Sequence, residues 1–124
     1  MELPLRFASV ELQNDFDIVK RAMANNVYAF QYAGSEAQKD SGIVRLAIER
    51  HPSMLQFADE AIQDNETIVC IAIQQRASAF LHASKRIRSD KHAVWQAMQV
   101  NKDVLWYADT TLLQDPELQA CLNR

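Results

Sequence analysis

The sequence predicts an all-α protein, an α-solenoid built from short antiparallel helix pairs. Its 124 residues include only two Gly and three Pro, too few for the many turns of a β-sandwich or barrel. The apolar residues recur with helical rather than strand spacing. The whole pattern also repeats every 25 residues without a gap, which is typical of stacked supersecondary units. We therefore expect about ten short helices in one domain, residues 1–124.

The repeat is clearest at an Asp or Asn that opens each unit. Chance similarity between amphipathic helices would drift in phase, whereas this column and two Ala columns keep their register along the chain. The three columns are Asp15, Asp40, Asn65, Asp90 and Asp115; Ala22, Ala47, Ala72 and Ala97; and Ala8, Ala33, Ala58, Ala83 and Ala108. The predicted boundaries are a half-repeat at 1–14, repeats at 15–39, 40–64, 65–89 and 90–114, and a half-repeat at 115–124.

Each unit is predicted to hold two helices of about ten residues. The opening Asp or Asn is an N-cap, whose side-chain oxygen can accept a free backbone N–H. Pro116 supports this assignment, because proline is favoured at the first helical position. Pro52 is expected to end one helix and begin the next. The second helix of the first full unit would carry Ala29, Phe30, Ala33 and Ala37 on one stripe.

The stretches "DFDIVKRAMANNVYAFQYAGSEAQKD" and "DKHAVWQAMQVNKDVLWYADTTLLQD" resemble the short helical repeats known as domain of unknown function 4116. The resemblance covers nearly all of the chain. Its third copy departs from the pattern, with Asn65 in place of Asp and His82 in place of an aromatic residue. The resemblance implies an architecture, and it brings no catalytic residue with it.

Composition excludes several functional classes. A formal net charge of −3 gives no global attraction to nucleic acid or anionic membranes. No run approaches the ~20 apolar residues of a transmembrane helix, and the first residues lack the features of a secretory signal. The two cysteines, Cys70 and Cys121, show no metal or redox spacing and fit a reducing compartment. We therefore predict a cytoplasmic protein.

The sequence contains no catalytic or cofactor motif. His51, His82 and His92 fall at different repeat positions and share no metal-ligand spacing. His82 is expected to be a partly buried substitute for an aromatic residue. Cys70 has no adjacent base in sequence and is expected to be a passive thiol. We predict a protein that is not an enzyme and that binds neither a cofactor nor a metal.

Four repeat columns change from polar to apolar along the chain. Trp is favoured at the centres of protein interfaces, so one interpretation is a surface for a protein partner or for self-association. The other is that the late units curve inward and bury these side chains. The residues concerned are Cys70, Leu81, Trp95, Val100 and Trp106.

The stretch "SKRIRSDK" suggests a second kind of surface. Clustered cations supply the salt-dependent part of nucleic-acid binding. The cations also lie at a helix end, where they complement the dipole, and one repeat after acidic residues that could form salt bridges with them. The basic residues are Lys85, Arg86, Arg88 and Lys91, and the acidic residues are Asp59, Glu60, Asp64 and Glu66.

The two ends of the chain differ in character. Residues 5–15 match the second half of a unit whose first helix is absent from the sequence. Leu3 and Val10 make its outward face apolar and a second candidate for contact, whereas Gln119 and Asn123 predict a polar outer face on the last helix. The sequence thus predicts a non-enzymatic module for protein interaction or self-association. Nucleic-acid binding at Lys85–Lys91 is the alternative and ranks behind it.

Overall fold

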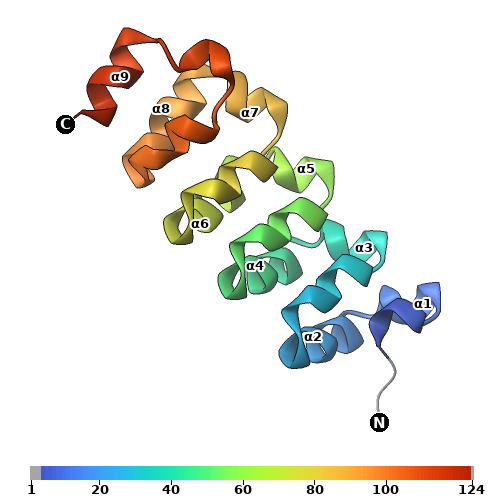
Figure 1. Ribbon diagram of the computed structural model, residues 1–124. Coiled ribbons are helices and arrows are strands. Elements are labelled where there is room, and N and C mark those ends of the chain that lie inside the picture. The colour runs from blue at the N-terminus through green and yellow to red at the C-terminus, as the bar shows by residue number, and fades with distance from the viewer. Residues whose placement is uncertain (1–3, 124) are drawn as a thin grey trace.

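The computed structural model describes residues 4–123, and every element within that range is a helix. The prediction of an all-α protein is confirmed. The elements follow one another along the long direction of the molecule, so that the two ends of the chain lie at opposite ends of it (Figure 1). No described helix is long and apolar enough to cross a bilayer.

Four ten-residue helices form one side of this array. They are α2 (Phe16–Asn25), α4 (Ser41–Arg50), α6 (Glu66–Gln75) and α8 (Lys91–Val100), followed by the shorter α9 (Pro116–Leu122). The predicted N-caps are confirmed in all five. For example, Asp40 accepts a hydrogen bond from the backbone N–H of Ile43 at 2.9 Å, and Asp115 does the same for Glu117 at 3.0 Å. Pro116 occupies the first turn of α9 as expected.

The second half of each unit differs from the prediction of a single helix. It holds a six-residue 3-10 helix, an extended break and then a short helix. In the first full unit these are η2 (Val27–Tyr32) and α3 (Ser35–Lys39). Ala33, expected inside a helix, instead lies at the break with φ −65° and ψ 149°. Each unit therefore contains three helical elements rather than two.

The break recurs along the chain. Before the first full unit lie η1 (Leu5–Phe7) and α1 (Val10–Gln13). The later pairs are η3 (Pro52–Phe57) and α5 (Glu60–Gln63); η4 (Ala77–His82) and α7 (Lys85–Ser89); and η5 (Lys102–Tyr107) and η6 (Thr110–Leu112). Pro52 begins η3 as predicted.

A hydrogen bond between units explains the break. Just after it, the backbone N–H of Gly34 donates to the carbonyl of Gln13, in the preceding unit, at 2.8 Å. The N–H groups of Asp59, Ser84 and Asp109 do the same to the units before them, at 2.9 to 3.0 Å. An N–H committed to a neighbouring unit cannot also close a helical turn, so the second helix is interrupted there.

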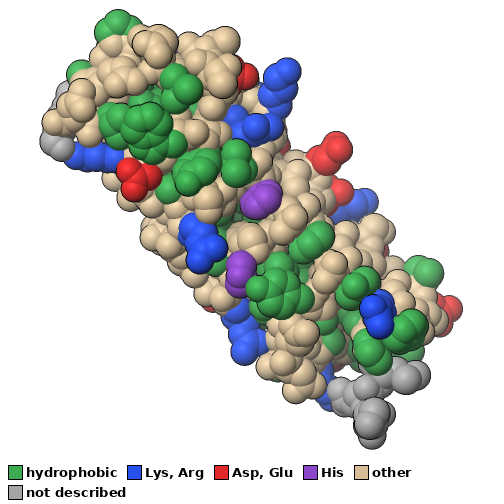
Figure 2. Space-filling view, in the orientation of Figure 1, with side chains coloured by type: hydrophobic (Ala, Val, Ile, Leu, Met, Phe, Trp, Pro, Cys, Tyr) green, Lys and Arg blue, Asp and Glu red, His purple; other side chains and the backbone are tan. Residues whose placement is uncertain are grey.

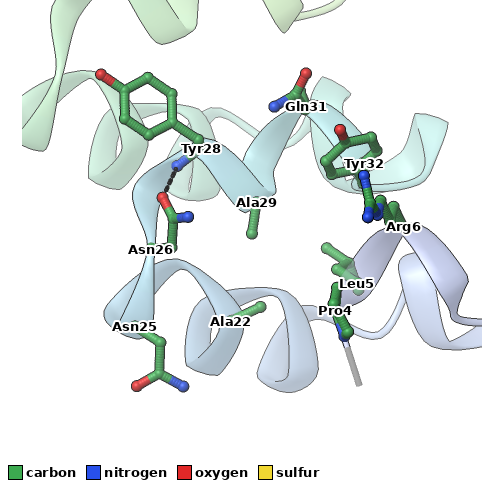
Figure 3. A pocket seen from close by; sticks show the side chains of 10 residues that line it. All are labelled: Pro4, Leu5, Arg6, Ala22, Asn25, Asn26, Tyr28, Ala29, Gln31 and Tyr32. Atoms are coloured by element: carbon green, nitrogen blue, oxygen red, sulfur yellow. Dashed lines mark hydrogen bonds between the residues drawn. The ribbon is translucent and has the colours of Figure 1, made fainter. Parts of the chain in front are cut away.

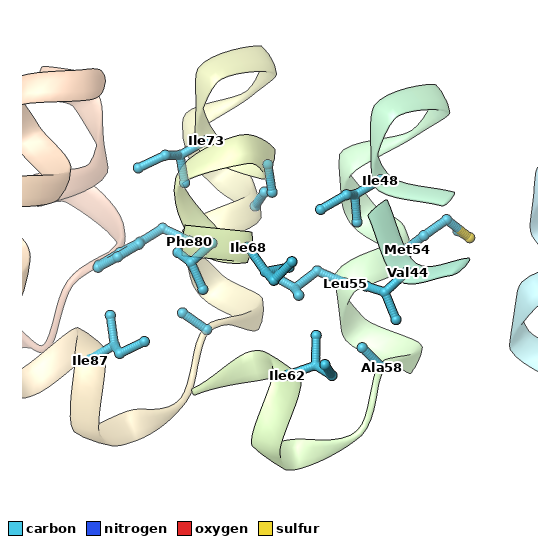
Figure 4. Packing of buried hydrophobic residues seen from close by; sticks show 14 of the residues in the cluster. Val44, Ile48, Met54, Leu55, Ala58, Ile62, Ile68, Ile73, Phe80 and Ile87 are labelled. Atoms are coloured by element: carbon cyan, nitrogen blue, oxygen red, sulfur yellow. The ribbon is translucent and has the colours of Figure 1, made fainter. Parts of the chain in front are cut away.

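Buried hydrophobic side chains form one continuous core between the two sides of the array (Figure 4). Helix α4 packs against η3 and α6, and α6 packs in the same way against η4 and α8. Ala47 and Ala72 are fully buried where these helices approach one another. Full burial at both positions is what a close crossing of the helices would require.

Side chains at the ends of α4 and α6 tie neighbouring helices together. The Arg50 guanidinium donates to the carbonyl of Met23 at 2.5 Å, and the Gln75 amide donates to the carbonyl of Ile48 at 2.9 Å. Val100 follows in the same column and has no donor, and Asn101 supplies the bond instead, to Ile73 at 3.0 Å. The polar side chains of Arg50 and Gln75 in this column therefore satisfy carbonyls at the C-terminal end of the neighbouring helix.

Candidate interaction surfaces

The late apolar residues lie at the surface. Trp106 is 60% exposed and Leu81 is 50% exposed, and Trp95 and Val100 are also exposed, while Cys70 is half-buried. The interpretation that late units curve inward and bury these side chains is therefore wrong. Over residues 4–123, each unit follows its predecessor in the same direction along the molecule (Figure 1).

These residues do not form a single patch. Leu81 lies on η4 and Trp106 on η5, and these two helices pack against each other. Cys70 and Trp95 lie instead on α6 and α8, where they line one hollow of about 460 Å³. Hydrophobic side chains gather over the end of the molecule that holds α8 and α9 (Figure 2). Val100 stands apart at the last residue of α8.

The titratable groups near these surfaces are poorly suited to catalysis. Burial raises the pKa of the Cys70 thiol, and the charge of Glu66 raises it further. A nucleophilic cysteine requires the opposite shift, because the thiolate is the reactive form. Burial lowers the pKa of half-buried His82, as does the nearby cation of Arg88, so the ring favours its neutral form. Both residues behave as partly buried packing groups.

Ion pairs between units engage part of the basic segment. The Arg86 guanidinium lies 2.8 Å from a carboxylate oxygen of Asp64 and 3.9 Å from Glu66. The Ser84 hydroxyl donates to the same carboxylate at 2.5 Å. The Ser84 and Arg86 hydrogen bonds hold the pKa of Asp64 below its usual range. The interpretation of a salt bridge between neighbouring units is confirmed for Arg86 and Asp64, whereas Glu66 belongs to the same unit, residues 65–89, as Arg86.

The remaining cations of the segment are partly engaged as well. The Lys91 ammonium lies 3.0 Å from Asp115 and 3.4 Å from Glu117, and the Asp115 hydrogen bond raises the pKa of Lys91. Arg88 donates to the carbonyl of Ala83 at 3.1 Å. A phosphate group would have to compete with these internal partners of Arg86, Arg88 and Lys91, which lowers the attraction that these three cations could offer.

The N-terminal end carries an apolar surface of its own. Val10 is 71% exposed on α1, and Leu3 lies outside the described residues. Two hollows, of about 410 and 450 Å³, open at this end and share Leu5 and Ala22 in their walls. Leu5, Ala22 and Ala29 point into one of them, between η1, α2 and η2 (Figure 3).

Sequence analysis identified this end as a contact candidate but missed the residues that form it. Leu12 and Ile18 line the second hollow with Ala22, whereas Val10 does not. Leu12, Ile18 and Ala22 belong to apolar columns whose members in the second, third and fourth full units are buried or nearly so.

The last helix is only partly as expected. Asn123 is exposed, in agreement with a polar outer face. Gln119 is half-buried instead, and its amide donates to the carbonyl of Leu113. This hydrogen bond explains why a polar side chain is half-buried here, because the Gln119 amide satisfies a backbone carbonyl just before α9.

Comparison with known proteins agrees with this architecture. A family model described as "Domain of unknown function (DUF4116)" matches residues 3–36, 40–88 and 72–113. The chain belongs to this family. No curated protein and no solved structure gives a significant match. Membership of the DUF4116 family assigns no activity, so a function has to be argued from the surfaces themselves.

Proposed function

We propose that the chain is a non-enzymatic interaction module, an α-solenoid of 25-residue units that presents its surface to a protein partner. The regular placement of α2, α4, α6 and α8, which begin at residues 16, 41, 66 and 91, supports the repeat. The recurring backbone hydrogen bonds between units support the stacking. Such arrays expose extended surfaces that suit binding rather than chemistry.

The exposure of Trp106 beside Leu81 carries the proposal. These two large apolar side chains lie on adjoining 3-10 helices, where the corresponding early residues are Gln31 and Gln56. Removing an indole and a leucine from water on contact with a partner is favourable, and Trp is enriched at interface centres. A protein partner or a second copy of the chain could bury them.

Affinity capture from the native host tests the proposal with matched variants. Trp106→Lys should lose a partner that the wild-type chain retains. Leu46→Lys changes another exposed apolar residue, on α4 rather than on η4 or η5, and this variant should still capture the partner. Light scattering after size exclusion distinguishes self-association, which Trp106→Lys should also abolish. Identical captured proteins for all three chains, with no dimer, would contradict the proposal.

Nucleic-acid binding is the alternative, and it predicts salt-sensitive retention on heparin that Lys85→Glu weakens. Absence of retention at low salt would eliminate it. The proposed compartment is the cytoplasm, which is supported by two cysteines that are both free thiols.

A further inference from the structure

The strongest unexplained feature is the outward side of α2, α4, α6, α8 and α9, which lies opposite the core. Its residues are three or four apart in each helix, and residues with this spacing share one helix face. It does not include η4 or η5, which carry Leu81 and Trp106. We call this surface the α face and define it by Asp17, Lys20, Arg21 and Ala24 of α2; Gly42, Arg45, Leu46 and Glu49 of α4; Thr67, Cys70, Ile71 and Gln74 of α6; His92, Trp95, Gln96 and Gln99 of α8; and Glu117 and Ala120 of α9.

The centre of the α face differs from its ends in composition. The outward residues of α6 and α8 include no Asp, Glu, Lys or Arg, whereas both α2 and α4 carry charged residues at these positions. The centres of protein interfaces are depleted in charged residues and enriched in Trp. Trp95 lies within the uncharged region and is 39% exposed. The region therefore has the composition expected at the centre of an interface.

The uncharged region combines a projecting side chain with a hollow. The hollow of about 460 Å³ lies between α6 and α8, with Cys70 and Gln96 among the residues that line it and Trp95 at its edge. Cys70 is short, whereas the same repeat position holds the long side chains of Lys20 in α2 and Arg45 in α4. A large apolar group from another molecule can therefore approach α6 over Cys70, where a longer side chain would block it.

The two ends of the α face differ in charge. Cations outnumber carboxylates at the end formed by α2 and α4, whereas carboxylates outnumber cations at the end formed by α9. The residues are Lys20, Arg21 and Arg45 against Asp17 and Glu49 at the first end, and Asp115 and Glu117 against Lys91 at the second. Among the residues that the structure describes, Arg45 forms no ion pair. The Glu117 side chain lies 3.4 Å from Lys91 and is still 79% exposed, so it can accept a second cation.

A surface with this charge pattern is complementary to a second copy of itself whose units run in the reverse order. A two-fold axis parallel to the helices, midway between α6 and α8, gives this arrangement. It places α6 of one copy over α8 of the other, and α4 of one copy over α9 of the other. If the units of both copies ran in the same order, like charges would meet at both ends. The charge pattern therefore favours the reversed pair.

The positions of the residues along their helices agree with this arrangement. Cys70 and Trp95 are each the fifth residue of a helix, so Trp95 of one copy would lie over Cys70 of the other. Arg45 is the fifth residue of α4, and Glu117 is the second residue of α9. A difference of three residues corresponds to about 4.5 Å along a helix, which the long side chain of Arg45 can span.

The size of the α face indicates how strongly two copies would associate. A ten-residue helix is about 15 Å long, and packed helices lie about 8–10 Å apart. The part of the face from α4 to α9 therefore covers about 500 Å² on each copy and about 1,000 Å² on both. This area is at the lower limit for a specific interface, so we expect a dimer with a dissociation constant in the micromolar range.

We propose that two copies of the chain associate through the α face. Trp95 of each copy occupies the hollow beside Cys70 of the other copy, and Arg45 pairs with Glu117 of the other copy at both ends of the interface. Burial of the two indoles stabilises the dimer, and the ion pairs fix the direction in which the copies lie. Trp106 stays exposed in this dimer, so the inference is independent of the partner binding proposed above.

Light scattering of the full chain at about 0.01–1 mM tests the dimer with two matched variants. The mass of the wild type should rise from that of a monomer towards that of a dimer. Trp95→Lys should stay a monomer, with its melting temperature maintained because lysine occupies the same repeat position in α2. Trp106→Lys makes the same change on η5 and should dimerise as the wild type does. Self-association through Trp106 predicts the opposite results for the two variants.

Charge reversal tests the direction in which the two copies lie. Arg45→Glu and Glu117→Arg should each weaken dimerisation at least about fivefold, because each change creates two repulsive contacts per dimer. The double variant Arg45→Glu/Glu117→Arg restores opposite charges and should dimerise within about twofold of the wild type. Sedimentation equilibrium at low salt, where surface charges are least screened, measures the dissociation constants.

Several outcomes would overturn the proposal. A wild-type chain that stays monomeric up to about 1 mM would show that the α face does not support a dimer. Dimerisation that survives Trp95→Lys, or that Trp106→Lys abolishes, would place the interface elsewhere. A double variant that dimerises as weakly as the single variants would show that Arg45 and Glu117 do not meet. Loss of a captured partner in Trp106→Lys is a separate measurement, so the two proposals can fail independently.

Discussion

The junction between α4 and α6 and the N-terminal groove, which we define by Leu5, Leu12, Ile18 and Ala22, contain similar residue types in different surroundings. In the junction, Ile68 and Ala72 lie beneath α4 and are buried. In the groove, Ile18 and Ala22 occupy the same repeat positions and are half-buried. The comparison teaches that a repeat position is core only when a neighbouring unit covers it, because each helix pair alone leaves one apolar face exposed.

Of the changes compared, truncation of an isoleucine to alanine should give the largest difference in lost stability between the two regions. Ile68→Ala removes buried methyl groups and leaves a cavity, so the free energy of unfolding should fall by about 2–5 kcal/mol. Ile18→Ala removes a side chain that is already in contact with water and should cost about 1 kcal/mol or less. Urea denaturation with an unchanged m-value measures both. Equal losses would show that the groove is as closely packed as the junction.

Enlargement of the alanine should give a smaller difference of the same kind. Ala72→Leu inserts three carbon atoms where α6 meets its neighbours and should destabilise the protein by about 1–3 kcal/mol. Ala22→Leu places the same atoms in the open groove and should change stability by less than about 0.5 kcal/mol. Thermal unfolding compares the pair. A melting temperature of Ala72→Leu equal to that of the wild type would refute a close crossing at this site.

The smallest expected effect concerns the dependence of stability on pH. It applies to the internal units, because an ion pair between Asp64 and Arg86 joins two of them. Asp64 has a pKa below its ordinary value of 3.8, because Ser84 and Arg86 donate to its carboxylate. A depressed pKa in the folded state stabilises the protein above the unfolded-state value. This contribution is lost as the pH falls through the lower folded-state value.

Asp64→Asn should therefore lose less of its free energy of unfolding than the wild type does as the pH falls. Urea titrations at pH values from neutral to below 3.8 measure this loss. The change should shrink in high salt, since both Asp64 and Arg86 are exposed and solvent screens their interaction. A variant with the same acid profile as the wild type would mean that this pair contributes nothing measurable to stability.

The sequence predicted the location of some candidate surface residues better than that of others. It identified Trp106 and Leu81 through their departure from the repeat, and both lie exposed on adjoining helices. It also grouped Cys70 and Trp95 with them, although these lie on α6 and α8 and line a different hollow. A change of residue type within a repeat column shows that a residue is unusual. Which columns lie on the same face of the molecule depends instead on the direction that the chain takes after each 3-10 helix.

The sequence alone determined the features that depend on neighbours along the chain. These include the helix caps Asp15 and Asp40 and the all-α composition, since capping and helical stripes act within about one or two turns. Only the tertiary structure decided where the second helix breaks. The N–H of Gly34 finds its acceptor, Gln13, on another unit.

Burial was decided by the tertiary structure as well. Leu12 and Ile62 follow the same sequence pattern, yet Leu12 is 44% exposed whereas Ile62 is 8% exposed and belongs to the hydrophobic core. Arg86 likewise pairs with Asp64 through stacking of their units. Local hydrogen bonds and periodicity depend on residues that are adjacent in sequence, whereas exposure and ion pairing depend on which surfaces meet once the units are stacked.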